Sequence, residues 1–201
     1  MQITEVRSLG KGKYCVELEQ GKSLQLYKKE LQGLSLEEGQ ELEEEQYHYL
    51  LYEVIGKRAK KRAMYLLEKM DRTESQLREK LQQNGYPEEV VDLAVEYVKK
   101  YHYIDDFRYA CTYIRYRCEK KSRRGLTQEL LQKGVSKELI QQALEREYES
   151  NEEDLICDWM RKKHFNPKTA DVKEQRKMYQ FLLRKGFQSN DILTKMHSYE
   201  D

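Results

Sequence analysis

Apolar residues recur along this chain in a pattern that repeats three times, at intervals of about 50 residues. In each copy two apolar residues lie four positions apart, and a glycine and a further apolar residue follow. The copies are Leu77, Leu81, Gly85 and Tyr86; Leu126, Leu130, Gly134 and Val135; and Met178, Leu182, Gly186 and Phe187. Residues four apart share one helix face, and glycine adopts at little cost the left-handed conformation that ends a helix. The pattern predicts three helix–cap–helix units, with each last residue folded back on the leucine five positions before it.

The first 34 residues follow a different pattern. Short stretches of alternating apolar and polar residues are interrupted by Gly10, Gly12 and Gly21, which predicts two or three short strands joined by hairpin turns. A sheet this small needs support from another element. Ser35 and Glu38 then have the spacing of a capping box that opens a helix.

The expected fold is therefore mainly α, a tandem array of three three-helix repeats with a small N-terminal β extension. The expected segments are a β extension at 1–34, a linking helix at 35–56, and repeats at 57–104, 105–149 and 150–201. Arrays of this kind form binding surfaces more often than catalytic pockets.

Short polar side chains mark the expected helix starts within the repeats. The expected N-caps are Thr73 (with Gln76 completing a capping box), Asp105 or Asp106, Ser136 and Ser150. Residues 122–125 are expected to form a loop before the helix that ends at Gly134.

Charge becomes informative only once it is located, because 36% of the residues are charged and the formal net charge is only +1. Basic residues gather in two clusters: Lys57, Arg58, Lys60, Lys61 and Arg62; and Arg115, Arg117, Lys120, Lys121, Arg123 and Arg124. Clustered cations can contact a phosphate backbone or an acidic protein face. The alternative is a solvated helix face paired with the acidic runs at 37–45 and 147–154. Both clusters are candidate contacts, and we favour the second because it ends in a glycine-containing loop.

Tyrosine is abundant, with 16 residues, and Tyr109, Tyr113 and Tyr116 fall on one side of a predicted helix. Tyrosines beside cations can stack on unpaired bases. Helices in an array are often covered on two faces, however, and tyrosine suits such packing. We favour packing for these three.

Other classes of function find little support in the sequence. Cys15, Cys111, Cys118 and Cys157 form no CxxC pair, which predicts reduced thiols in a cytoplasm. The cysteines and the four scattered histidines do not have the spacing of a metal site, so neither a metal nor a cofactor is expected. No P-loop, GxSxG or dinucleotide motif is present, and an enzyme is not expected. No apolar run approaches 18 residues, so no membrane span is predicted.

Three short motifs resemble the signatures of a known family. They are Arg72-Thr73-x-x-Gln76-Leu77-x-x-Lys80-Leu81-x3-Gly85-Tyr86; Tyr103-Ile104-Asp105-Asp106-x-x-Tyr109-Ala110; and Leu130-x-x-Lys133-Gly134-Val135 with Ile140 and Ala143. Their order and spacing resemble those of RecX, the bacterial regulators of the RecA recombinase. The resemblance covers about residues 57–148 well and the third repeat loosely. Thr73 and Gln76 stand where the family usually has Ser and Glu, and both still suit a capping box.

The resemblance implies a cytoplasmic, monomeric, non-enzymatic protein that acts in homologous recombination, DNA repair and the SOS response. Family members bind the groove of the filament that RecA forms on single-stranded DNA, where they inhibit ATP hydrolysis and strand exchange and promote disassembly. Filament capping and internal groove binding both stay open at this point, as do inhibition and modest stimulation. Two further hypotheses are a helical-repeat protein that binds DNA without RecA, and a helical adaptor for another protein.

Overall fold

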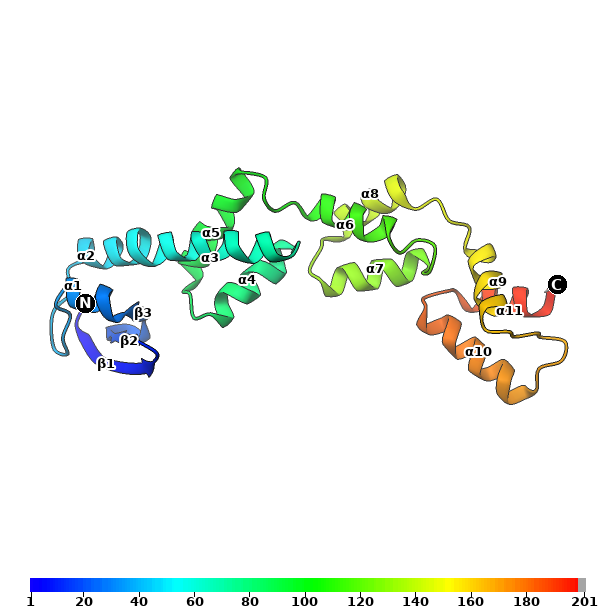
Figure 1. Cartoon of the computed structure of the whole chain (residues 1–201), viewed down its shortest axis with the longest axis horizontal. Coiled ribbons are helices and arrows are strands. Elements are labelled where there is room, and N and C mark those ends of the chain that lie inside the picture. The colour runs from blue at the N-terminus through cyan, green and yellow to red at the C-terminus, as the bar shows by residue number, and fades with distance from the viewer. Residues whose placement is uncertain (199–201) are drawn as a thin grey trace. The chain divides into compact units, whose positions relative to one another are not determined.

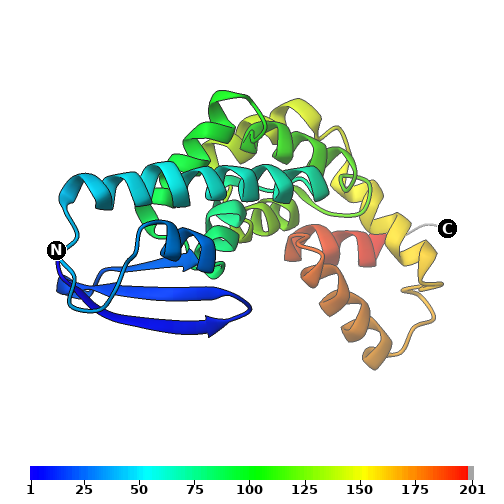
Figure 2. The ribbon, with the colours of Figure 1, turned by 60° about the vertical axis from the view of Figure 1, so that its left-hand side comes forward.

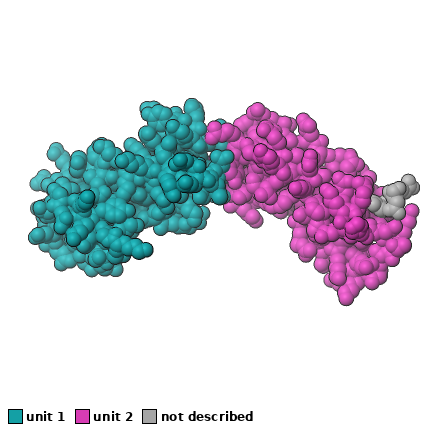
Figure 3. Space-filling model, in the orientation of Figure 1, with its two compact units in different colours: residues 1–105 teal, residues 106–201 magenta. Residues whose placement is uncertain are grey.

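The computed structural model of the protein describes residues 1–198. The chain divides into two units, Met1–Asp105 and Asp106–Asp201 (Figure 3). Unit 1 contains β1 (Ile3–Gly10), β2 (Lys13–Leu18), η1 (Glu19–Gly21), β3 (Ser23–Tyr27), α1 (Lys28–Gly33), α2 (Glu44–His48), η2 (Tyr49–Ile55), α3 (Gly56–Lys69), α4 (Glu74–Gln83) and α5 (Glu88–Lys100) (Figure 1). Unit 2 contains α6 (Asp106–Arg115), α7 (Arg123–Gln132), α8 (Lys137–Glu147), α9 (Glu152–Lys162), α10 (Val172–Arg184) and α11 (Ser189–Ser198). The three predicted three-helix repeats are α3 to α5, α6 to α8 and α9 to α11.

The N-terminal strands form an antiparallel sheet in the order β1-β2-β3, as the alternating pattern predicts. Val16 in the central strand lies opposite Val6 on one side and Leu24 on the other. The sheet lies beneath a long helix in Figure 2. That helix supplies the support that so small a sheet requires.

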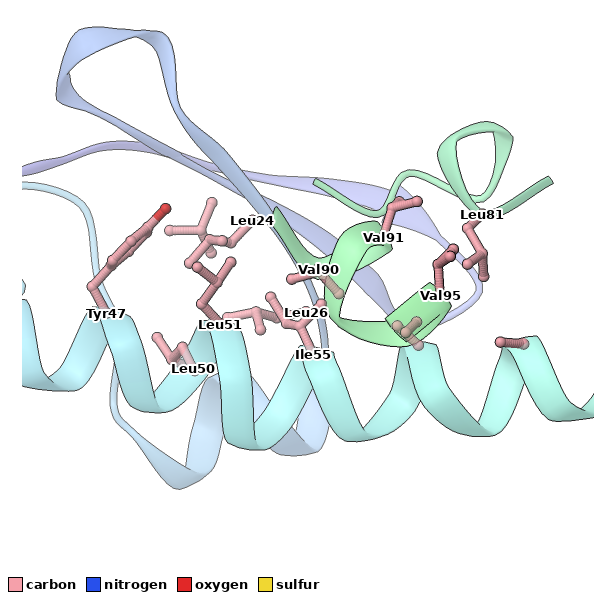
Figure 4. Close-up of a cluster of buried hydrophobic side chains, with 14 of the residues drawn as sticks. Leu24, Leu26, Tyr47, Leu50, Leu51, Ile55, Leu81, Val90, Val91 and Val95 are labelled. Carbon is pink, nitrogen blue, oxygen red and sulfur yellow. The ribbon is translucent and has the colours of Figure 1, made fainter. Parts of the chain in front are cut away.

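The core of unit 1 joins this sheet to the first repeat. Leu24 and Leu26 of β3 point toward Leu51 and Ile55 of η2, and Val90 of α5 lies beside them (Figure 4). All five side chains are at most 1% exposed. Because burial of apolar surface is the main favourable contribution to folding, the β extension and the first repeat stabilise each other.

The long helix runs without interruption through α2, η2 and α3. Its middle part, η2, is a π-helix, yet the backbone keeps right-handed helical angles at His48, Tyr49, Ile55 and Gly56. A Cβ atom at Gly56 would lie only 2.8 Å from Leu93 Cδ2, so the glycine permits close packing against α5. The expected boundary between a linking helix and the first repeat therefore falls inside one continuous helix.

The predicted helix start at Ser35 is wrong. Ser35 has φ +47° and ends α1 instead: its N–H donates to Gln32 O, and the next residue donates to Leu31 O. Glu38 accepts from Val6 N at 3.0 Å rather than completing a capping box. The following backbone pairs with the edge of β1, because Ile3 N donates to Gln40 O and Gly39 N donates to Ile3 O, each at 2.9 Å. The helix begins only at Glu44.

The predicted caps at the three repeat glycines are confirmed. Gly85, Gly134 and Gly186 have φ values of +81°, +82° and +92°. In each case the glycine N–H donates to the carbonyl three residues before it, at 2.8 to 2.9 Å. The next N–H donates to the carbonyl of the predicted leucine at 3.1 to 3.3 Å. These are the two hydrogen bonds of a Schellman motif.

Other predicted boundaries shift by a residue or more. Thr73 and Ser136 cap their helices as expected, and the α9 cap is Asn151 rather than Ser150. Residues 123–125, expected in a loop, form the first turn of α7, and Ser122 is its N-cap.

Two glycines bring the second and third repeats into contact within unit 2. A Cβ atom at Gly186 would lie 2.5 Å from Gly125 Cα, and one at Gly125 would lie 2.5 Å from Lys185 O. The Ser122 hydroxyl, which is fully buried, accepts from Gly125 N at 3.0 Å and donates to Lys185 O at 3.3 Å. The start of α7 and the cap of α10 therefore meet through their backbones.

We predict that Gly186→Ala destabilises the protein more than Gly39→Ala, where φ is +81° and an added Cβ atom would meet nothing within 4 Å. Both substitutions place a side chain in the left-handed region, at a cost of roughly 1–2 kcal/mol. Only the change at Gly186 also forces an atom into the α7 backbone, which adds roughly 1–3 kcal/mol. Urea unfolding followed by circular dichroism measures both, and equal losses would contradict the close contact.

Candidate nucleic-acid interface

The first basic cluster, on α3, is divided among different surroundings. Lys57 is exposed and pairs with Glu53 at 3.0 Å. Arg58 is largely covered and donates to Glu30 at 2.6 Å and to Gln25 O at 2.5 Å. Lys60 lies 5.4 Å from the centre of the Tyr97 ring, on the side of α5. Lys61 is exposed, and the partly buried Arg62 lies 5.4 Å from the centre of the Tyr65 ring. The five cations therefore do not form one free surface.

Half of the second basic cluster is used inside unit 2. Arg115 makes two hydrogen bonds to the Glu147 carboxylate, at 2.8 and 2.9 Å. Lys121 forms an ion pair with Glu129. Arg123 donates to Tyr148 O at 3.1 Å, and its guanidinium lies 4.7 Å from the centre of that ring. If Arg115, Lys121 and Arg123 contacted an external partner, they would lose these contacts within unit 2.

The other half of the cluster remains available. Arg117, Lys120 and Arg124 are exposed, and within residues 1–198 none of the three forms an ion pair. The Arg117 guanidinium lies 4.5 Å from the centre of the Tyr113 ring, which orients it without neutralising it. These three residues are the free cations of the second cluster.

Two cations that the sequence analysis missed join this cluster. Lys133 Nζ lies 5.3 Å from the same Tyr113 ring, on which Arg117 also stacks. Lys185 Nζ lies 4.4 Å from the centre of the Trp159 ring, and Trp159 Nε1 donates to Lys120 O at 3.1 Å. Lys133 and Lys185 both stand immediately before a cap glycine. This shared position in the repeat is the feature of the sequence by which the two lysines could have been predicted to join the cluster.

These residues are close enough to influence one another. Burial lowers the pKa of Lys121, and the charges of Lys185 and Arg117 lower it further. We define the cationic surface of unit 2 as five residues from two repeats: Arg117, Lys120, Arg124, Lys133 and Lys185.

Tyr109, Tyr113 and Tyr116 do not all have the same surroundings. Two of them pack against the protein, and one is free to stack on a base. The rings of Tyr109 and Tyr113 stack at 6.1 Å, and the Tyr113 hydroxyl donates to Glu129 at 2.9 Å. Both side chains are partly buried against the core of the second repeat, in agreement with the favoured packing interpretation. Tyr116 is 78% exposed and could stack on a base.

The described part of the chain holds no group of three or more His, Cys, Asp or Glu side chains that could bind a metal ion. Cys111 lies in the core of the second repeat, and Cys118 packs against it.

Helix α6 begins at Asp106, one of the two aspartates that were expected to cap it. Within residues 1–198, no helix combines the length and the hydropathy that a membrane span requires.

Family comparisons match all three repeats. The matching models are RecX first three-helix domain at residues 59–97, RecX second three-helix domain at 105–144 and RecX third three-helix domain at 151–196. Two relatives, both named regulatory protein RecX, are similar over most of their length. That of Caldanaerobacter subterraneus subsp. tengcongensis is 34% identical over 79% of each chain, and that of Clostridium acetobutylicum is 32% identical over 75% of this chain and 69% of its own.

Solved structures agree with the fold. A crystal structure of regulatory protein RecX has a TM-score of 0.61 and 25% identity, and the similarity covers 96% of this chain and 98% of the other. RecX from Lactobacillus salivarius has a TM-score of 0.59 over 71% of this chain and 94% of its own; at 20% identity this likeness concerns the fold alone.

We predict that the Arg115–Glu147 pair makes a pH-dependent contribution to stability. The hydrogen bond from Arg115, reinforced by its charge, lowers the pKa of Glu147 below its usual range. A lowered pKa stabilises the folded state above the unfolded value of about 4.3, and this contribution is lost as the pH falls through the folded value. Glu147→Gln should therefore lower the urea midpoint at neutral pH, and the difference should shrink in acid. A difference that stays constant with pH would contradict the charge effect.

Proposed function

The chain belongs to the RecX family, and on that premise we propose that it regulates a RecA recombinase by binding the filament that RecA forms on single-stranded DNA. The observation that carries this proposal is the match of all three repeats to the three RecX domains, in order. In this proposal the protein binds and has no catalytic activity of its own.

The cationic surface of unit 2 supplies a physical means of contact. Arg117, Lys120 and Arg124 are exposed and without an ion pair among the described residues. Such cations attract the phosphates of DNA, or an acidic protein face, at the expense of bound counterions. A molecule held in the filament groove in this way would hinder the cycling of neighbouring RecA subunits and the entry of a second duplex.

Direct binding to single-stranded DNA is a second candidate function. The exposed Tyr116 ring follows α6 directly and adjoins Arg117 in the sequence. Exposed rings beside cations are the usual means by which proteins hold single strands without sequence preference. Separate measurements of binding to DNA alone and to the filament would distinguish the two functions.

We predict that the purified protein suppresses the DNA-dependent ATPase and strand exchange of RecA and co-sediments with RecA on single-stranded DNA. Suppression at far fewer molecules than RecA subunits would indicate filament capping or disassembly, because each bound molecule would then affect many subunits. The protein incubated with ATP alone serves as the control for intrinsic hydrolysis. Unchanged ATPase, strand exchange and filament length would contradict the proposal and leave the adaptor hypothesis.

We also predict that a triple substitution of Arg117, Lys120 and Arg124 by Gln weakens filament binding and reduces its salt dependence. Each lost contact with a single-strand phosphate lowers the slope of log K against log salt by about 0.7, so three lost contacts lower it by about 2. The matched control replaces Lys28, Lys29 and Lys173 by Gln, which are exposed and lie outside the cationic surface.

Binding of the triple variant to naked DNA and to the RecA filament distinguishes a contact with phosphate from a contact with RecA. Loss of binding to both naked DNA and the filament would indicate phosphate contact. Loss on the filament alone would indicate an acidic face of RecA. If the variant folds and inhibits RecA as the control does, the surface makes no contact and the α3 cluster becomes the next candidate.

A further inference from the structure

A polar pocket lies in unit 1 where the sheet meets the first repeat. It has a volume of about 280 Å³ and lies among β2, β3, α3 and the turn that follows α4. Its lining includes Lys13, Tyr27, Arg58, Arg62, Asn84 and Tyr86. Sites for whole cofactors are usually larger, roughly 300–1,000 Å³. The size therefore suits a small polar group.

The lining carries an excess of positive charge. Of its three cations, Arg58 is neutralised by Glu30 at 2.6 Å. Lys13 and Arg62 form no ion pair within residues 1–198. The Lys13 ammonium and the Arg58 guanidinium lie 6.0 and 4.8 Å from the centre of the Tyr27 ring. Two positive charges without an ion pair among the described residues thus line this small pocket.

One donor of a pocket-lining side chain has no acceptor among the described residues. Arg62 Nε is buried, and over the described part of the chain it finds no hydrogen-bond partner. Native proteins pair nearly all of their buried polar groups, because a buried donor without an acceptor loses its hydration and gains nothing. Because Arg62 also lines the pocket, its guanidinium has hydrogen-bonding capacity left for an acceptor bound there.

The frame of the pocket is held in place before any ligand arrives. Arg58 donates to Gln25 O at 2.5 Å, which ties α3 to β3. The Gln25 side chain packs against Gly85, where an added Cβ atom would lie 2.2 Å from Gln25 Nε2. The backbone of Tyr86 is held in place because its N–H donates to Leu81 O at 3.3 Å. A preorganised site binds with a smaller loss of conformational entropy.

We propose that this pocket binds a phosphate group. The donors come from different elements, Lys13 from a strand, Arg62 from a helix and Tyr86 from a turn, so they approach from different directions. A tetrahedral phosphate offers oxygens in several directions, whereas a carboxylate offers two in one plane. The group can belong to a free phosphate or to the backbone of a nucleic acid strand. The proposal depends on unit 1 alone and is independent of any action on RecA.

The test is titration calorimetry of the full-length protein with inorganic phosphate, with potassium chloride at matched ionic strength as reference. Arg62→Gln and Lys13→Gln each remove one cation and should weaken phosphate binding by about tenfold, since a hydrogen bond to a charged group is lost. Lys100→Gln, an exposed change elsewhere in unit 1, should bind as the unaltered protein does. Thermal unfolding in phosphate should give a rise in midpoint that follows the same order.

Two outcomes would overturn the proposal. Equal phosphate binding by all four proteins would mean an adventitious ion only, and absence of phosphate-specific heat in the unaltered protein would mean no site. Lys13 lies partly exposed on a strand, so Lys13→Gln keeps the test valid if Arg62→Gln fails to fold.

A second titration identifies the source of the phosphate. If the group belongs to a nucleic acid, a short thymidine oligonucleotide should compete with inorganic phosphate in the unaltered protein, and Arg62→Gln should lose that competition. If free phosphate binds and the oligonucleotide does not compete, the pocket holds a free phosphate. Both results support a phosphate site, and neither depends on whether RecA is inhibited.

Discussion

The fold depends on one backbone conformation, the left-handed residue that ends a helix and turns the chain back. Gly85, Gly134 and Gly186 adopt it once in each repeat. Each glycine lets the next residue donate to a carbonyl of the last helical turn while its side chain returns to the core. Without this reversal the second and third helices of a repeat could not share a core.

The same conformation also controls which parts of the chain can touch. At Gly186 the absence of a side chain lets the cap of α10 meet the backbone of Gly125. This contact explains why the second repeat has glycine where Gln76 and Glu174 complete capping boxes in the other two. The contact also fixes Lys185, the residue before the cap, beside the basic cluster of the second repeat. A constraint on backbone packing thus determines where a charge is placed.

Sequence reasoning located the features that depend on local periodicity and failed where distant contacts decide. The three glycine caps and the Thr73 capping box follow from residue type and spacing, and all were predicted. His102 and His164 end α5 and α9 with the same two hydrogen bonds and φ values of +56° and +51°. Neither was predicted, because a left-handed histidine is held by its surroundings and carries no mark in the sequence. The predicted helix start at Ser35 was wrong for a related reason, because the backbone contacts of this segment depend on α1 and on the edge of β1, which is distant in the sequence.

The candidate surfaces were predictable as clusters but not as sets of available charges. The sequence places eleven basic residues in two runs, yet Arg58, Arg115, Lys121 and Arg123 satisfy carboxylates or carbonyl oxygens within their own unit. Such pairing explains how a chain with a net charge of +1 can still present local excesses of positive charge. Among the described residues, the excess remains where packing leaves a cation without an ion pair, at Arg117, Lys120 and Arg124 in unit 2 and at Lys13 and Arg62 in unit 1. A contact surface of this chain is therefore better sought among the cations that the fold leaves unpaired than among the residues that identify the fold. Those residues are caps and core positions, which already hold the repeats together.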